Sequence, residues 1–194
     1  MELTVIGFTW ICYFTMHSML ATDLMKTRLC EQMPGLARYY RLIYNTYALV
    51  TLIVPVALVL GFRGADLFAP SGIWGVADRL VQLASVIGLL WSLSAYNFGE
   101  LSGFKPAISP PELSAKGPLK LCRHPIYLFG LLLIWTGAHN AATLLSAILI
   151  TLYIFVGMRI EEHRLEKQFG AAYREYQQTV PMLLPWPRAR AKSS

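Results

Sequence analysis

Apolar residues gather in long blocks along the chain, and polar segments separate these blocks. The first block runs for about 20 residues without a charge, which is long enough for a helix to cross the hydrocarbon core of a bilayer. Five blocks are candidate spans: residues 3–22, 42–62, 80–98, 126–138 and 141–158. Only His139-Asn140 separates the last two, so we expect a helical hairpin there, with Pro125 at its first helical position.

The pattern changes after the fifth block. Spacings of four, four and three residues place four side chains on one face of a helix: Leu165, Phe169, Tyr173 and Tyr176. We therefore predict a cytosolic amphipathic helix over residues 159–178, interrupted at Gly170 and ended by Val180-Pro181. The expected fold is a single all-α integral membrane domain over residues 1–194, with five transmembrane helices.

Composition supports a membrane protein. Of the 194 residues, 55% are hydrophobic and 14% are charged, whereas roughly a quarter are charged in soluble domains. The three cysteines, Cys12, Cys30 and Cys122, form no C-x-x-C pair, so neither a disulfide framework nor a zinc site is predicted. The expected partners are the lipid bilayer and a small or lipophilic molecule, with no nucleic acid and no metal.

The distribution of positive charge predicts the topology. With five spans, fifteen of the Lys and Arg residues fall on one side of the membrane and two (Arg63 and Arg79) on the other. The positive-inside rule then places the N-terminus outside and the C-terminus in the cytoplasm. We expect an inner-membrane protein whose basic tail, which contains Arg188, Arg190 and Lys192, lies on the cytoplasmic side.

Two polar clusters flank the hairpin: residues 123–127 (Arg-His-Pro-Ile-Tyr) and Glu161-Glu162. Charges at a membrane boundary are costly unless they bind something. Arg123 and His124 beside a helix N-terminus suit a carboxylate, and the two glutamates suit an ammonium group or ribose hydroxyls. In the alternative, Arg123 pairs with Glu161 or Glu162 and locks the hairpin. Spacing leaves both interpretations open.

Further polar residues lie near the predicted cytoplasmic helix ends, notably His17, Asn45 and Asn97. Together they indicate a pocket open to the cytosol and the inner leaflet, although His17 could instead simply bond a neighbouring side chain. The long connector over residues 101–122 contains Pro106, Pro110 and Pro111. It is either a disordered linker or a functional loop, and we favour the second because it leads directly into Arg123.

The two clusters resemble a family signature. Arg-His-Pro-x-Tyr-x-x-Gly over residues 123–130, preceded by Gly117-Pro118, is similar to the isoprenylcysteine carboxyl methyltransferase and phospholipid methyltransferase superfamily. So is the Glu-Glu…Leu…Phe-Gly…Tyr…Tyr…Val-Pro pattern over residues 161–185. Tyr40-Arg41-x-x-Tyr44-Asn45 and His17-Ser18-x-x-Ala21 resemble a bacterial branch with NnrU-like proteins and membrane thiol methyltransferases. Leu119 departs from the pattern, where many members carry Tyr.

The resemblance implies a methyltransferase that uses S-adenosylmethionine and acts on a lipophilic or small thiol, carboxylate or amine acceptor at the cytosolic leaflet. It implies catalytic roles for Arg123 and Glu162. His17 and Asn97 are candidate contacts for the methyl acceptor. The implied cofactor-binding residues are Gly117, Arg123, His124, Pro125, Tyr127, Gly130, Glu161 and Glu162.

Two other classes compete with this interpretation. A membrane reductase with a related C-terminal architecture and a nicotinamide cofactor would need more spans and a larger nucleotide pocket. A non-catalytic membrane protein, such as a transporter or an assembly factor, could keep the same fold. The absence of inverted repeats and of mid-span charges argues against a transporter.

Overall fold

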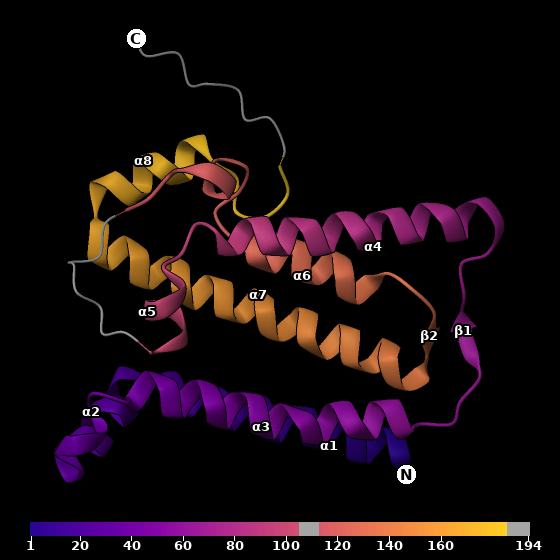
Figure 1. Cartoon of the computed structure of the whole chain (residues 1–194), viewed down its shortest axis with the longest axis horizontal. Coiled ribbons are helices and arrows are strands. Elements are labelled where there is room, and N and C mark those ends of the chain that lie inside the picture. Colours follow the sequence, from indigo (N-terminus) through magenta and orange to yellow (C-terminus); the bar gives the residue numbers. More distant parts are fainter. Residues whose placement is uncertain (105–112, 186–194) are drawn as a thin grey trace. The chain divides into compact units, whose positions relative to one another are not determined.

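The computed structural model describes residues 1–104 and 113–185. Three prolines of the long connector (Pro106, Pro110 and Pro111) and the basic tail lie outside the described residues. The elements, labelled in Figure 1, are α1 (Glu2–Ala21), α2 (Asp23–Gln32), η1 (Pro34–Leu36), α3 (Tyr40–Gly61), β1 (Asp66–Phe68), α4 (Gly72–Leu93), α5 (Phe98–Ser102), η2 (Gly117–Lys120), α6 (Pro125–Trp135), β2 (His139–Asn140), α7 (Ala141–Phe169) and α8 (Ala171–Thr179).

The predicted helical membrane architecture is confirmed. Over the described part of the chain, four helices are long and apolar enough to cross a membrane: α1, α3, α4 and α7. The fourth predicted span, residues 126–138, corresponds to α6, which has 11 residues. At 1.5 Å per residue α6 covers about 16 Å, roughly half of the hydrocarbon thickness. The helical part of this predicted span is therefore shorter than the hydrocarbon core is thick, and the count of five spans stays a prediction.

The chain forms two compact units. Unit 1 comprises Met1–Ala69, Asn97–Ile108 and Ala138–Ile150. Unit 2 comprises Pro70–Tyr96, Ser109–Gly137 and Thr151–Ser194.

Unit 1 is built on α1 and α3, which pack side by side (Figure 1). Its buried core contains Ile6, Trp10 and Ala142. The indole N–H of Trp10 donates to the hydroxyl of Ser146 in α7 at 2.8 Å, which gives a buried polar group the partner it needs. A short antiparallel pairing of β1 with β2 was not predicted. The polar connector after α1 also contains an unpredicted helix, α2.

Unit 2 is built on α4 and α6, which are neighbours in Figure 1. Small residues form the buried face of α4: Ser85, Gly88 and Ser92. The ring of Phe129 lies directly against Gly88, as is typical of membrane helices that approach closely through small residues. Both carboxylate oxygens of Asp78 accept the backbone N–H of Gly137 at 3.0 Å.

Two helix boundaries differ from the prediction. The span expected over residues 80–98 is a helix from Gly72 to Leu93, because Asp78 has a partner inside the fold and does not end the helix. The fifth span and the amphipathic helix are continuous in α7, which runs to Phe169. Gly170, with φ of +56°, separates α7 from α8 because this left-handed backbone does not continue a helix.

Candidate functional site

The two sequence clusters come together in unit 2, at the start of α6. The backbone N–H groups of Arg123 and His124 donate to the carbonyls of Pro181 (2.9 Å) and Met182 (3.2 Å). The Nη1 group of Arg123 donates to the carbonyl of Val180 at 2.6 Å. The Arg-His-Pro segment is therefore bound to the Val-Pro segment that follows α8, and both motifs contribute to one structure.

Arg123 and Glu162 form a buried ion pair. Their side chains are 7% and 10% exposed. Nε of Arg123 donates to Oε1 of Glu162 at 2.9 Å, and Nη2 donates to Oε2 at 2.7 Å. Two parallel bonds from a planar guanidinium to a carboxylate are the strongest common geometry for such a pair.

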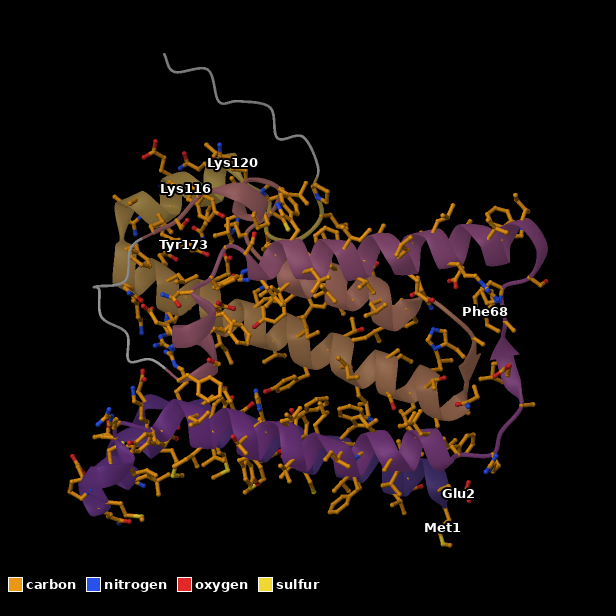
Figure 2. The ribbon with its side chains drawn as sticks, viewed as in Figure 1. Met1, Glu2, Phe68, Lys116, Lys120 and Tyr173 are labelled. Carbon is orange, nitrogen blue, oxygen red and sulfur yellow. The ribbon has the colours of Figure 1, made fainter. Side chains whose placement is uncertain are left out.

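Three further side chains bind the same carboxylate. Oε1 accepts from the hydroxyl of Tyr173 at 2.8 Å and lies 2.7 Å from Nε2 of His124. Oε2 accepts from the amide of Gln177 at 2.9 Å. We call these residues the Glu162 network: Arg123, His124, Glu162, Tyr173 and Gln177. Tyr173 is labelled in Figure 2. The carboxylate is surrounded by donors.

A pocket of about 280 Å³ opens beside this network. Its described lining residues are Ala95, Tyr96, Leu113, Ser114, Leu119, Arg123, His124, Glu161, Leu165, Gln168, Phe169, Tyr173 and Tyr176. We call it the Glu161 pocket, because Glu161 supplies an acidic side chain that is 45% exposed. The carboxylate of Glu161 lies 3.6 Å from Nδ1 of His124.

The tyrosines around the pocket are held in their neutral form. Burial, followed by the neighbouring charge of Glu162, raises the pKa of Tyr173. Burial raises the pKa of Tyr176 to about 12, and its hydroxyl donates to the carbonyl of Leu119 at 2.6 Å. Burial also raises the pKa of the Cys122 thiol to about 11. Near neutral pH, Tyr173 and Tyr176 therefore act as hydrogen-bond donors, and the thiol of Cys122 stays protonated.

The predicted cofactor-binding residues all belong to unit 2. Arg123, His124 and Glu161 line the pocket, whereas Glu162 binds Arg123 and His124 within the network. Tyr127 stacks on the ring of His124 with 5.6 Å between centroids. Of the remaining three, Gly117 begins η2, Pro125 begins α6 and Gly130 lies within α6. Their roles toward a ligand remain predictions.

The two predicted acceptor contacts belong to unit 1. Nε2 of His17 lies 2.9 Å from the hydroxyl of Tyr44, and the His17 ring stacks on Tyr13. Oδ1 of Asn97 accepts the backbone N–H of Gly99 at 3.1 Å and caps α5. Each side chain thus has a local structural partner, and contact with an acceptor stays a prediction for both.

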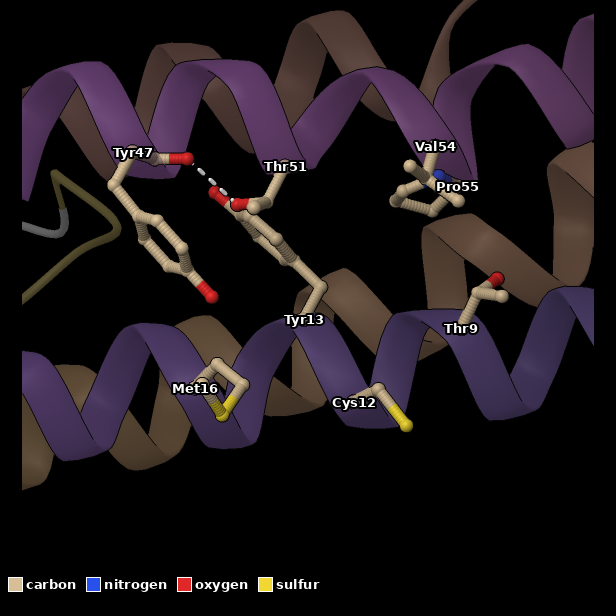
Figure 3. A pocket seen from close by; sticks show the side chains of 8 residues that line it. All are labelled: Thr9, Cys12, Tyr13, Met16, Tyr47, Thr51, Val54 and Pro55. Atoms are coloured by element: carbon tan, nitrogen blue, oxygen red, sulfur yellow. Dashed lines mark hydrogen bonds between the residues drawn. The ribbon is translucent and has the colours of Figure 1, made fainter.

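Unit 1 contains a second hollow, of about 190 Å³, between α1 and α3 (Figure 3). The residues lining it are uncharged: Thr9, Cys12, Tyr13, Met16, Tyr47, Thr51, Val54 and Pro55. Thr51 donates to the carbonyl of Tyr47 at 2.8 Å, shown as a dashed line. This hollow offers no charged group to a ligand. Within residues 1–104 and 113–185, no group of three or more His, Cys, Asp or Glu side chains is placed to hold a metal.

Sequence reasoning missed part of the site. The sequence places Tyr173 and Tyr176 on a helix face and in the family pattern but gives their hydroxyls no partner. A buried tyrosine hydroxyl needs a partner, and this signal could have pointed to Glu162 for Tyr173. Tyr96 lies within the span predicted over residues 80–98 and has no predicted role in the site. Nothing in the sequence distinguishes Gln177 from the other polar residues of α8.

Comparisons with known proteins bear on the site and on the whole chain. A family model described as NnrU protein matches residues 5–187. Methanethiol S-methyltransferase 1 of Bradyrhizobium diazoefficiens is 35% identical over 62% of this chain and 48% of its own length. Methanethiol S-methyltransferase of Pseudomonas deceptionensis is 33% identical over 72% of this chain and 58% of its own length.

The chain therefore spans about half the length of these relatives. No solved structure matches it. The family model nevertheless covers nearly all of the chain, including both motifs and the four long apolar helices. This integral membrane protein belongs to the NnrU family, within the isoprenylcysteine carboxyl methyltransferase-like superfamily of membrane methyltransferases.

Proposed function

We propose that this protein is a membrane methyltransferase that uses S-adenosylmethionine and that the Glu161 pocket holds the cofactor. One observation carries the proposal: both family motifs are joined by the Glu162 network, and the pocket opens where they meet. The names of the relatives, which are methyltransferases, support the same activity.

The chemistry of the pocket suits this cofactor. S-adenosylmethionine carries an ammonium and a sulfonium cation, a carboxylate and a flat base. The half-exposed carboxylate of Glu161 suits a cation, and the rings of Tyr96 and Phe169 on the pocket wall suit a base or an onium group. The volume of about 280 Å³ is near the lower end of the roughly 300–1,000 Å³ of ligand pockets.

The bonds of the network indicate that some of its residues position the pocket and others contact the ligand. Nε, Nη1 and Nη2 of Arg123 all donate to Glu162 or to backbone carbonyls, so the role we give Arg123 and Glu162 is to position the wall of the pocket. His124 and Glu161 then meet the ligand. Nε2 of His124 faces a carboxylate that accepts hydrogen bonds, which fixes the orientation of the imidazole.

When bound, S-adenosylmethionine supplies a sulfonium methyl group that a nucleophile takes by in-line displacement. The protein's part is to align donor and acceptor and to keep water out. A small thiol is the acceptor that the relatives' names favour. A thiol attacks best as its thiolate, so the acceptor would first lose its proton to solvent, and S-adenosylhomocysteine would be the leaving group. We also propose that the C-terminus is cytoplasmic, with the pocket on that side.

The test uses the purified full chain. Titration with S-adenosylhomocysteine is expected to show one binding site. Incubation with methyl-labelled S-adenosylmethionine is expected to label methanethiol in preference to a prenylated cysteine analogue or a phospholipid. No binding by the wild type would remove the proposed function. Binding with labelling of phospholipid alone would keep the activity and overturn the thiol acceptor.

A further inference from the structure

The second half of α7 has one exposed face that changes from apolar to cationic. The helix continues without a break from its apolar segment into its charged one (Figure 1). Spacings of four, three, four and four residues place five side chains on this face: Leu152, Val156, Arg159, His163 and Lys167. All five are exposed and belong to unit 2. We call them the α7 stripe.

The apolar part of the stripe suits lipid chains. Leu152 and Val156 are each 59% exposed, and they belong to a helix that is long and apolar enough to cross a membrane. An exposed apolar face on such a helix packs against acyl chains. Arg159 follows Val156 by three residues, or about 4.5 Å along the helix axis. The cationic part of the stripe therefore begins where the apolar part ends.

The cationic part has no acidic partner in the described part of the chain. Within residues 1–104 and 113–185, the side chains of Arg159, His163 and Lys167 form no ion pair and no hydrogen bond. The nearest acid on this side of α7 is Glu166, and its Oε1 already lies 3.3 Å from Nη1 of Arg174. The charges of Arg159 and Lys167 are therefore available to an anion from outside the chain.

The stripe is separate from the Glu161 pocket. Glu161 comes two residues after Arg159, which is about 200° around the helix. Glu161, Leu165 and Gln168 line the pocket, so the pocket and the stripe lie on opposite faces of α7. A ligand of the stripe is therefore not the ligand of the pocket, and an inference about the stripe does not rest on the proposed function.

We propose that the α7 stripe binds one anionic phospholipid of the surrounding bilayer. An acyl chain packs on Leu152 and Val156, and the phosphate is bound by Arg159, His163 and Lys167. Arg159 and Lys167 each lie about 6 Å along the axis from His163, a distance that their long side chains can span to reach one phosphate. Such side chains lie along apolar surface while their charged ends reach the headgroups, and a guanidinium matches the geometry of a phosphate.

Native mass spectrometry of the full-length protein in detergent tests the stripe. The probes are dioleoyl phosphatidylglycerol, dioleoyl phosphatidylcholine and glycerol 3-phosphate. The wild type is expected to bind the first phosphatidylglycerol at least about tenfold more tightly than phosphatidylcholine, since each Lys or Arg near an anionic headgroup contributes about fivefold. In Arg159→Gln/Lys167→Gln the preference should fall to about twofold or less. Glycerol 3-phosphate should not bind, because it has no acyl chain to pack on the apolar part.

Lys116→Gln/Lys120→Gln is the matched control. It removes the same amount of charge from two exposed side chains, which are labelled in Figure 2. Leu119, between them in the chain, lines the Glu161 pocket, so they lie on the pocket side of α7. This variant should keep the preference for phosphatidylglycerol. An equal loss in the two double variants would overturn the inference, because net charge alone would then explain the preference.

Three other results would also contradict the proposal. The wild type could bind the two lipids equally, or it could bind glycerol 3-phosphate as tightly as phosphatidylglycerol. A dimer that only Arg159→Gln/Lys167→Gln loses would assign the stripe to a second copy of the chain. If that variant does not fold, Lys167→Gln in the last turn of α7 should lower the preference about fivefold, and an unchanged preference would overturn the inference.

Discussion

Glu161 and Glu162 are adjacent in the sequence but have opposite surroundings. The carboxylate of Glu162 is buried and receives hydrogen bonds from Arg123, Tyr173 and Gln177, with His124 also in contact. The carboxylate of Glu161 is 45% exposed and faces a pocket. Neighbouring helix residues point about 100° apart, so one residue can face the interior while the next faces an opening.

This difference assigns a structural role to Glu162 and a ligand-binding role to Glu161, which the sequence could not tell apart. A carboxylate surrounded by donors has little capacity left for a ligand, and removing it leaves buried charge uncompensated. A partly exposed carboxylate keeps that capacity. Variants at Glu162 should therefore act on stability, and variants at Glu161 on binding.

The largest effect is expected for Glu162→Ala. This change leaves the guanidinium of Arg123 and the imidazole of His124 without their carboxylate partner. Breaking such a buried ion pair lowers the free energy of unfolding by about 3–5 kcal/mol. Denaturant titration in detergent measures the loss of unfolding free energy. Glu166→Ala is the control, because the Glu166–Arg174 pair is exposed and worth about 1 kcal/mol or less. Equal losses in the two variants would contradict the contrast.

Tyr173→Phe should have the next largest effect. The hydroxyl donates to the buried Glu162 carboxylate, and a hydrogen bond to a charged group contributes about 1.5–3 kcal/mol. Tyr127→Phe provides the comparison, since it leaves every bond to the Glu162 carboxylate in place and keeps the ring that stacks on His124. The same denaturant titration should show a clear loss for Tyr173→Phe and a much smaller one for Tyr127→Phe. The reverse order would contradict a buried network centred on Glu162.

Glu161→Gln tests the other side of the contrast. It removes the charge that we assign to the ligand while keeping the shape of the side chain. Affinity for S-adenosylhomocysteine should fall about tenfold or more, because a charge-assisted contact is lost, and the unfolding free energy should stay within about 0.5 kcal/mol. Glu166→Gln should change neither quantity. Unaltered affinity in Glu161→Gln would remove Glu161 from the binding site.

The smallest effect concerns Cys122. Its side chain is fully buried, and burial raises the pKa of its thiol to about 11, so the reactive thiolate is scarce at pH 7 and remains scarce at pH 9. A water-soluble maleimide should label Cys30, which is partly exposed, and should reach Cys122 only after denaturation. Mass spectrometry of the labelled peptides provides the measurement. Rapid labelling of Cys122 in the folded protein would show that the segment before α6 opens.

The pattern of apolar blocks was sufficient to predict the long helices and the proximity of the two motifs. The pattern was not sufficient to assign a partner to Arg123. The spacing of a helical hairpin allows Arg123 to bind either the carboxylate of a ligand or that of Glu161 or Glu162. The structure has the internal pair with Glu162. Helix ends were also missed where a charged residue finds a partner far along the chain, as Asp78 does at Gly137.

The sequence predicted some features of the local backbone but not others. Gly170 was expected to interrupt the C-terminal helix, and it does so through a positive φ. Arg41 donates to the carbonyl of Glu100, and Asn45 donates to those of Leu101 and Ser102, at the end of α5. These bonds had no signal beyond the Tyr-Arg-x-x-Tyr-Asn motif itself. Backbone carbonyls are their acceptors, and every residue type supplies a carbonyl, so sequence patterns cannot reveal such contacts.

The most direct test of the account is to locate the cofactor. Ultraviolet irradiation of the full-length protein with labelled S-adenosylmethionine, followed by peptide mapping, identifies the residues beside the ligand. The account predicts label on aromatic residues of the Glu161 pocket, namely Tyr96, Phe169 or Tyr176, with most of it lost in Glu161→Gln and retained in Glu166→Gln. Label confined to the hollow between α1 and α3, at Tyr13 or Tyr47, would contradict it.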